Sequence, residues 1–124
     1  MDPYSDIVRE RFADPAHAGE VENGIAAYFA DQGMCIRLTA KLSSGALREL
    51  RFQAWGCPHV IAACETFCRC FEGRPATDLE QFETARIMKD LAVPVEKTGR
   101  ILVLEDTVRS LRAAIADRSP TTQD

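Results

Sequence analysis

The sequence lacks the features that mark several functional classes. No run of about 18 apolar residues is present, so we expect no membrane-spanning helix. The segment Met1–Asp6 has neither the basic nor the apolar region of a secretory signal, which leads us to expect a cytoplasmic protein. Acidic residues outnumber basic ones, 19 against 15, and the net charge of −4 argues against nucleic acid as a partner.

Familiar chemical motifs are absent as well. The chain contains no glycine-rich phosphate loop, no dinucleotide fingerprint and no pair of carboxylates at a catalytic spacing. It also has no Cys-x-x-Cys pair, which argues against a zinc knuckle and against a thioredoxin-type redox centre.

What the sequence does have is five cysteines, an odd number that differs from the even disulfide framework of small secreted domains. Cys35 stands alone, whereas the other four lie within the segment 57–70. In a reducing compartment, such cysteines are buried apolar thiols, metal ligands or reactive thiolates.

Alternating apolar and polar residues predict a small antiparallel sheet. The segment 34–42 alternates throughout, and a turn at Ser43–Gly45 leads to a second alternating run over 50–54. We expect the segment 24–30 to add a third strand, because two strands alone are marginally stable.

Helical spacing of apolar residues predicts helices on both sides of these strands. They fall over 4–13, between Gly56 and Gly73, over 77–91 behind a capping box at Thr77–Glu80, and around Leu104–Ile115. The pattern is that of an α+β protein with a single domain over 1–118 and a flexible tail over 119–124.

Cys57 is the first candidate for a functional residue. It follows a predicted strand and Gly56, and Pro58 suits the first position of a helix, which places Cys57 at or near the N-cap. Unpaired amide groups and the helix dipole stabilise a thiolate there. The position predicts a nucleophilic or metal-binding sulfur; the structural alternative is a small residue that fills a tight corner.

His59 lies beside this corner and has two functional interpretations. As a ligand it would bind a metal together with Cys57, and as a cation it would lower the pKa of that thiol. The structural alternative is a solvated polar residue at a helix start.

The remaining cysteines differ in their predicted surroundings. Cys64 and Cys68 fall on the apolar face of the helix and are predicted to pack in the core, whereas Cys70 projects from another side and is expected to be partly exposed. Cys35 lies on the polar face of its strand, and the pattern leaves open whether that face points to Cys57 or to solvent.

Several segments occur in the order and spacing of a known family. They are Tyr4–Ser5, Val8, Phe12, Asp14–Pro15 and Gly19; the run Arg51–Cys57; Ile61–Ala62 and Gly73; Glu105–Asp106; and Ala113–Asp117. Together they resemble the IscU/NifU-type iron–sulfur cluster scaffold family over residues 4–118.

The resemblance implies a fold, a cargo and a partner. The fold is α+β and IscU/SufE-like, with a three-stranded antiparallel sheet and about four to five helices. In members of that family, three cysteines and an aspartate lie at one end of the sheet. They assemble a [2Fe–2S] cluster there with sulfur from a cysteine desulfurase, and many members also bind zinc at the same place. Such a protein is a scaffold and not an enzyme.

The ligand positions of that family are only partly filled in this chain. Cys57 matches one ligand cysteine. The first cysteine of the family and its following glycine and aspartate fall at Gln32–Met34, and its histidine–cysteine pair falls at Gly99–Arg100. The segment Val93–Lys97 is a weak match to the one that such scaffolds present to a chaperone, and does not support a chaperone as a partner.

A [2Fe–2S] cluster normally takes four protein ligands, mostly thiolates. We therefore predict that iron or a nascent cluster binds through Cys57, with Cys35 and His59 as the further candidate ligands in a reduced set. The alternative is a persulfide acceptor or a regulator of a cysteine desulfurase that holds no cluster, since Arg100 would favour an anionic sulfur at Cys57.

Overall fold

The computed structural model describes residues 4–122 of the chain, and side chains as far as residue 117. The elements in order are α1 (Asp6–Ala13), β1 (Ile25–Asp31), β2 (Met34–Ser43), β3 (Ala46–Trp55), α2 (Pro58–Phe71), the 3-10 helix η1 (Ala76–Gln81), α3 (Thr84–Leu91), the 3-10 helix η2 (Val95–Lys97) and α4 (Thr98–Thr122). The strands form a three-stranded antiparallel sheet in the order β1-β2-β3. The predicted α+β class and third strand are confirmed.

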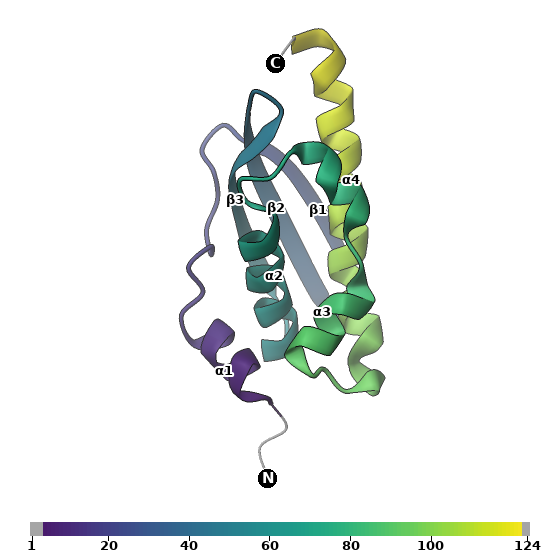
Figure 1. Ribbon diagram of the computed structural model, residues 1–124. Coiled ribbons are helices and arrows are strands. Elements are labelled where there is room, and N and C mark those ends of the chain that lie inside the picture. The colour runs from purple at the N-terminus through teal and green to yellow at the C-terminus, as the bar shows by residue number, and fades with distance from the viewer. Residues whose placement is uncertain (1–3, 123–124) are drawn as a thin grey trace.

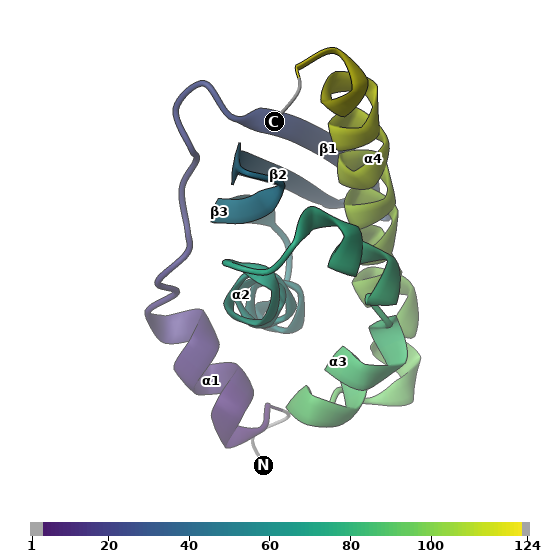
Figure 2. The ribbon, with the colours of Figure 1, turned by 45° about the horizontal axis from the view of Figure 1, so that its top comes forward.

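The helices cover one face of the sheet. α2 packs against β3, and α4 packs against β1 and β2, with α3 beside both helices (Figures 1 and 2). The strand residues that face the helices are apolar and buried: Ile25, Ala27, Ile36, Leu38, Ala40, Leu50 and Phe52. Each large side chain among them contributes about 1.5–3 kcal/mol by leaving water. The alternation predicted for β2 is therefore confirmed, except that Thr39 on the polar face is also buried, where its hydroxyl accepts a hydrogen bond from the Val21 amide at 2.9 Å.

A tight turn sets the register of the β2–β3 hairpin. Ser44 and Gly45 have φ angles of 53° and 81°, the left-handed conformation that a two-residue hairpin turn needs. The turn pairs Ser43 with Ala46. An irregularity between Lys41 and Leu42 then shifts the register by one residue, and the shifted register continues to a pair between Cys35 and Trp55. The predicted turn is confirmed.

The segment 77–91 differs from its prediction. It divides into η1 and α3, and η1 follows Pro75 with no side-chain cap. The capping box is wrong because Thr77 does not precede the helix: η1 begins at Ala76 with Pro75 at its N-cap, so Thr77 lies inside the first turn, and the chain leaves the helical conformation at Phe82.

α4 is the long C-terminal helix. It continues to Thr122, into the segment 119–124 that was predicted as a tail, while residues 123–124 lie outside the described part of the chain. Within residues 4–122, none of the helices is long and apolar enough to cross a membrane.

The segment 14–24, which we call the strap, joins α1 to β1 and runs beside β3. The Phe52 amide donates to the His17 carbonyl at 2.9 Å, and the Gly19 amide donates to the Phe52 carbonyl at 2.8 Å. Ala18 and Phe52 form a parallel bridge. The strap therefore covers part of the β3 edge.

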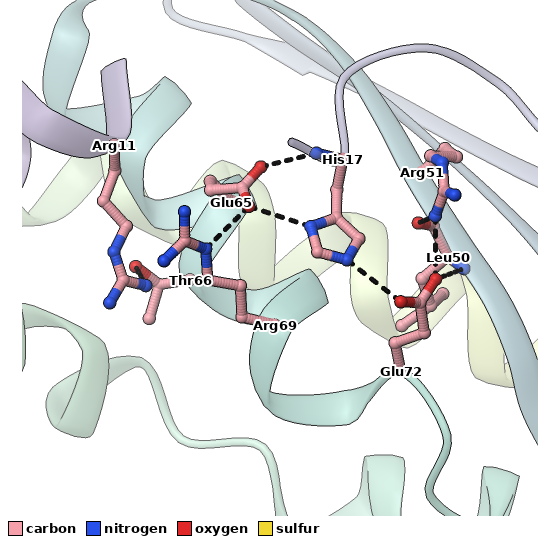
Figure 3. Close-up of polar contacts among 8 residues, drawn as sticks. All are labelled: Arg11, His17, Leu50, Arg51, Glu65, Thr66, Arg69 and Glu72. Carbon is pink, nitrogen blue, oxygen red and sulfur yellow. Dashed lines mark hydrogen bonds and ion pairs between the residues drawn. The ribbon is translucent and has the colours of Figure 1, made fainter. Parts of the chain in front are cut away.

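A network of charged side chains fastens the strap to α2 (Figure 3). Glu65 has a fully buried side chain and accepts hydrogen bonds from the His17 backbone amide and from Arg69 Nε, both at 2.8 Å, and its second contact with His17 joins Oε2 to Nδ1 at 2.8 Å. Glu72 Oε1 lies 3.0 Å from His17 Nε2, and Glu72 Oε2 accepts a hydrogen bond from Arg51 at 2.7 Å. His17 thus links both carboxylates.

The network lowers the pKa of both carboxyl groups. Burial alone would raise the pKa of Glu65, but hydrogen bonds from Arg69 and His17 outweigh it, so the pKa lies below its ordinary 4.5. The pKa of Glu72 is lowered in the same way, against burial, by the Leu50 amide, His17 and Arg51. Stability from such carboxylates is complete above the unfolded-state pKa and is lost as the pH falls through the lowered value.

We predict that Glu65→Gln lowers the free energy of unfolding by about 3 kcal/mol at pH 7, because His17 and Arg69 then face a neutral amide in a buried place. Urea unfolding followed by circular dichroism from pH 3 to pH 7 measures this. The wild type should lose stability below about pH 4.5, and the variant should lose less over the same range. Glu80→Gln, on an exposed residue, is the control. Equal stability of Glu65→Gln and wild type would contradict this role for the network.

Candidate functional site

Cys57 occupies the corner between β3 and α2. It is the N-cap of α2, with φ −80° and ψ 166°, and its side chain makes no capping hydrogen bond. Its carbonyl accepts from the amides of Val60 and Ile61 at 3.0 and 3.2 Å, while Pro58 supplies no amide. The half-buried thiol thus lies at the positive end of the helix dipole. The predicted N-cap position is confirmed.

Met34 lies against the backbone just before this cysteine. A Cβ atom placed on Gly56 would lie 2.5 Å from Met34 Sδ and 3.4 Å from Val60 Cβ, so any larger residue at position 56 would force Met34 aside. Met34 is half-buried and packs against the core, as Cys57 does. The first residue of β2 therefore brings a thioether to the corner that holds the thiol.

The start of α4 meets the β1–β2 turn at the same end of the molecule. A Cβ atom on Gly99 would lie 3.2 Å from Gln32 Oε1, so the Gln32 side chain takes the space that a side chain at position 99 would need. Lys97 and Arg100 lie close enough to His59 for their positive charges to lower its pKa. The β1–β2 turn, the start of α2 and the start of α4 therefore lie at one end of the molecule, the lower end of the view in Figure 1.

His59 is buried, which excludes the interpretation as a solvated residue. Its exposed fraction is 1%, and its ring packs against the Tyr4 ring with centroids 4.8 Å apart. Neither Nδ1 nor Nε2 has a hydrogen-bond partner among the described residues. Burial lowers the pKa of His59, and the charges of Lys97 and Arg100 lower it further. The neutral ring is favoured, so a cationic His59 that activates Cys57 is not supported.

Cys35 lies on the other face of β2. Its strand partner is Trp55, whose exposed fraction is 74%, and Tyr28 on β1 is 60% exposed. A hydrogen bond with Cys35 raises the pKa of Tyr28, and the negative charge of the thiolate form of Cys35 raises it further. By strand alternation, the Cys35 side chain points away from the helices, whereas Cys57 packs against the core on the helix side.

The other cysteines of α2 have the predicted surroundings. Cys64 and Cys68 are fully buried, and burial raises the pKa of each thiol far above its ordinary value. Cys70 is exposed, with Arg74 Nη1 at 3.5 Å from its Sγ. The core role of the first two is confirmed.

The structure brings no larger set of the usual metal donors together. Within the part of the chain that the structure describes, no group of three or more His, Cys, Asp or Glu residues is placed to hold a metal ion. The ligand set of Cys57, His59 and Cys35 therefore stays a prediction.

Comparison with protein families matches residues 3–119 to the NifU-like N-terminal domain. Among curated proteins, the chain is 25% identical over 122 residues to the iron–sulfur cluster assembly scaffold protein IscU of Azotobacter vinelandii, covering 92% of each chain. It is also 25% identical over 112 residues to the iron–sulfur cluster assembly protein IscU of Plasmodium falciparum, covering 86% of this chain and 69% of that one.

Solved structures show the same fold. The N-terminal part of a nitrogen-fixing NifU-like protein from Brucella abortus superimposes with a TM-score of 0.74 at 14% identity, and covers 92% of this chain and 94% of that one. A second structure, described as a putative SUF-system scaffold from Fervidobacterium islandicum, superimposes with a TM-score of 0.60 at 13% identity, covering 91% of this chain and 87% of that one.

We predict that His59→Leu raises the free energy of unfolding of the metal-free protein by about 1 kcal/mol, because it removes two buried nitrogens that have no hydrogen-bond partner within residues 4–122. Chemical denaturation at pH 7 measures the change. Thr107→Val is the matched control, since Thr107 is equally buried but donates to the Val103 carbonyl at 2.8 Å. The free energy of unfolding of Thr107→Val should not rise above that of the wild type. A clear loss of stability in His59→Leu would contradict the prediction.

Proposed function

The chain belongs to the NifU-like N-terminal domain family, and from this premise we propose that it is a scaffold-type protein of iron–sulfur cluster assembly. The proposal rests on one observation. The single cysteine that matches a family ligand, Cys57, lies half-buried at the N-terminus of α2, where its side chain makes no capping hydrogen bond and an incoming ion can reach it. The relatives named above are described as cluster assembly proteins, which supports the same function.

The donors at this end do not complete a cluster site within one chain. A [2Fe–2S] cluster normally takes four ligands, and Gln32, Gly99 and Arg100 supply no thiolate at the other family positions. We propose that Cys57 holds the iron or cluster cargo and that a partner or a second copy supplies missing ligands. His59 is the second donor that we propose. Cys35 could take part only after a change in β2, because it faces the other way.

A second candidate function is the acceptance of sulfur at Cys57 without a cluster. The position of Cys57 at the α2 N-terminus favours it, because the positive end of the helix dipole stabilises an anionic persulfide. The Cys57 thiolate attacks the outer sulfur of a persulfide on a donor cysteine. A sulfur–sulfur bond forms to Cys57, the bond in the donor breaks, and its electron pair leaves on the donor sulfur, which takes up a proton. We propose a cysteine desulfurase as this donor.

We predict that Cys57→Ser abolishes loading in anaerobic reconstitution with ferrous iron, cysteine and a cysteine desulfurase. Visible absorbance and counts of iron and sulfide detect a cluster, and the intact mass of the same sample detects an added sulfur atom. Cys70→Ser is the matched control, because Cys70 is exposed but lies at the other end of α2. It should load as the wild type does.

The outcomes separate the two candidates. A cluster spectrum that disappears in Cys57→Ser supports the scaffold function, and Cys35→Ser and His59→Leu then report the further ligands. A colourless protein with one sulfur atom added only when Cys57 is present supports sulfur acceptance. Loading of Cys57→Ser to the level of the wild type contradicts both.

A further inference from the structure

A hollow of about 530 Å³ lies between the β2–β3 turn, η1 and the later turns of α4. The β2–β3 turn and the later turns of α4 are at the upper end of the view in Figure 1, opposite the end that holds Cys57. The volume is in the range of about 300–1,000 Å³ that small-molecule sites usually have. None of the described residues that line the hollow takes part in the corner between β3 and α2, so a ligand bound here is independent of cargo at Cys57.

Much of the lining is apolar and small. Leu42 comes from β2, and Ile115, whose exposed fraction is 7%, comes from α4. Gly45, Ala76 and Ala113 also line the hollow, and their small size leaves the space between the three elements open. A lining of this kind accepts the apolar group of a ligand.

Two opposite charges line the same hollow from different elements. Glu80 lies on η1 and Arg112 lies on α4, and both residues are exposed. Within the part of the chain that the structure describes, neither side chain makes a hydrogen bond or an ion pair, so they do not neutralise each other. Arg109 lines the hollow as well, but its guanidinium donates to Asp106 at 2.9 Å and to Glu105 at 3.2 Å. Arg112 is therefore the cation that is left for a ligand.

A smaller hollow of about 200 Å³ adjoins the first at these charges. Glu80, Arg109 and Arg112 line both, and Glu105 lines the smaller one. The apolar space near the β2–β3 turn thus passes into a polar space between η1 and α4. Glu80 and Arg112 lie where the two meet, which is where the polar end of a ligand that has an apolar body would lie.

We propose that the larger hollow binds a free α-amino acid with a large apolar side chain. The Arg112 guanidinium donates hydrogen bonds to the carboxylate of the ligand, and the Glu80 carboxylate accepts hydrogen bonds from its ammonium group. Both contacts are charge-assisted, and a guanidinium can hold a carboxylate through two parallel hydrogen bonds. The apolar side chain fills the space beside Leu42 and Ala113. This site goes beyond the proposed function and does not rest on it.

The charges favour a zwitterion over an acid or an amine. A ligand with a carboxylate alone would bring a second negative charge close to Glu80, and a ligand with an amine alone would bring a second positive charge close to Arg112. A zwitterion offers each of these side chains an opposite charge. The pair Glu80 and Arg112 has no net charge, and neither does the ligand that we propose.

We predict that the full chain binds phenylalanine about tenfold or more tightly than it binds phenylpropanoate, which lacks the ammonium group, or phenethylamine, which lacks the carboxylate. Titrations of the isotope-labelled protein followed by NMR chemical shifts measure the three affinities. The shifts caused by phenylalanine should include the amides of Thr77 and Ala113, which lie on two walls of the hollow.

Substitutions test each part of the site. Arg112→Gln and Glu80→Gln should each weaken phenylalanine binding about tenfold or more, because each removes one charge-assisted contact. Arg48→Gln and Glu22→Gln are the matched controls, since both residues are exposed and lie outside the hollow, and these variants should bind as the wild type does. Ala113→Trp, also at an exposed residue, should fill the space and abolish binding without lowering the melting temperature.

Three results would overturn the proposal. The first is an absence of phenylalanine binding, the second is an affinity for phenylpropanoate or phenethylamine equal to that for phenylalanine, and the third is full affinity in Arg112→Gln. The assay contains no iron and no desulfurase. Its failure would therefore leave the proposed function untouched, and failure of reconstitution would leave this site untouched.

Discussion

The fold and the site both depend on the junction at which β3 becomes α2. The strand ends at Trp55 and the helix begins at Pro58, so one glycine and one cysteine make the whole turn. A side chain at Gly56 would have to displace Met34, whose Sδ atom lies in the space beside it. Cys57 must then cap the helix, and its thiol is left at the positive end of the dipole without a capping hydrogen bond. The chemistry proposed for this protein starts from that constraint.

The strap and α1 both pack against α2, and their packing explains why His59 is buried in the first turn of that helix. His17 and Glu65 tie the strap to α2, and α1 packs against the same helix. The Tyr4 ring, before α1, lies on the His59 ring, while Lys97 and Arg100 approach His59 from the α4 side. The surroundings favour the neutral His59 ring, and among the residues that the structure describes none bonds its nitrogens, a cost that proteins commonly accept at functional sites.

The sequence predicted what local patterns determine. The β2 alternation, the turn at Ser43–Gly45 and the Cys57 N-cap depend on a few neighbouring residues, and all three are confirmed. The burial of His59 could not be predicted, because it depends on Tyr4 and the start of α4, which are distant in sequence. The network of His17 and Glu65 was missed for the same reason, although a glutamate next to Cys64 on an apolar helix was a signal that a buried partner exists. The capping box failed because the helix begins one residue before Thr77, at Ala76, so that Pro75 occupies the N-cap position.

The central claim is that cargo binds at Cys57, and the reactivity of the five cysteines tests it most directly. The protein would be treated with an alkylating agent before and after anaerobic loading with iron, cysteine and a cysteine desulfurase, and each thiol quantified by peptide mass spectrometry. The account predicts that loading protects Cys57 while Cys70 stays reactive, and that buried Cys64 and Cys68 react in neither state. Unchanged reactivity of Cys57 in loaded protein, with protection at Cys70 instead, would contradict it.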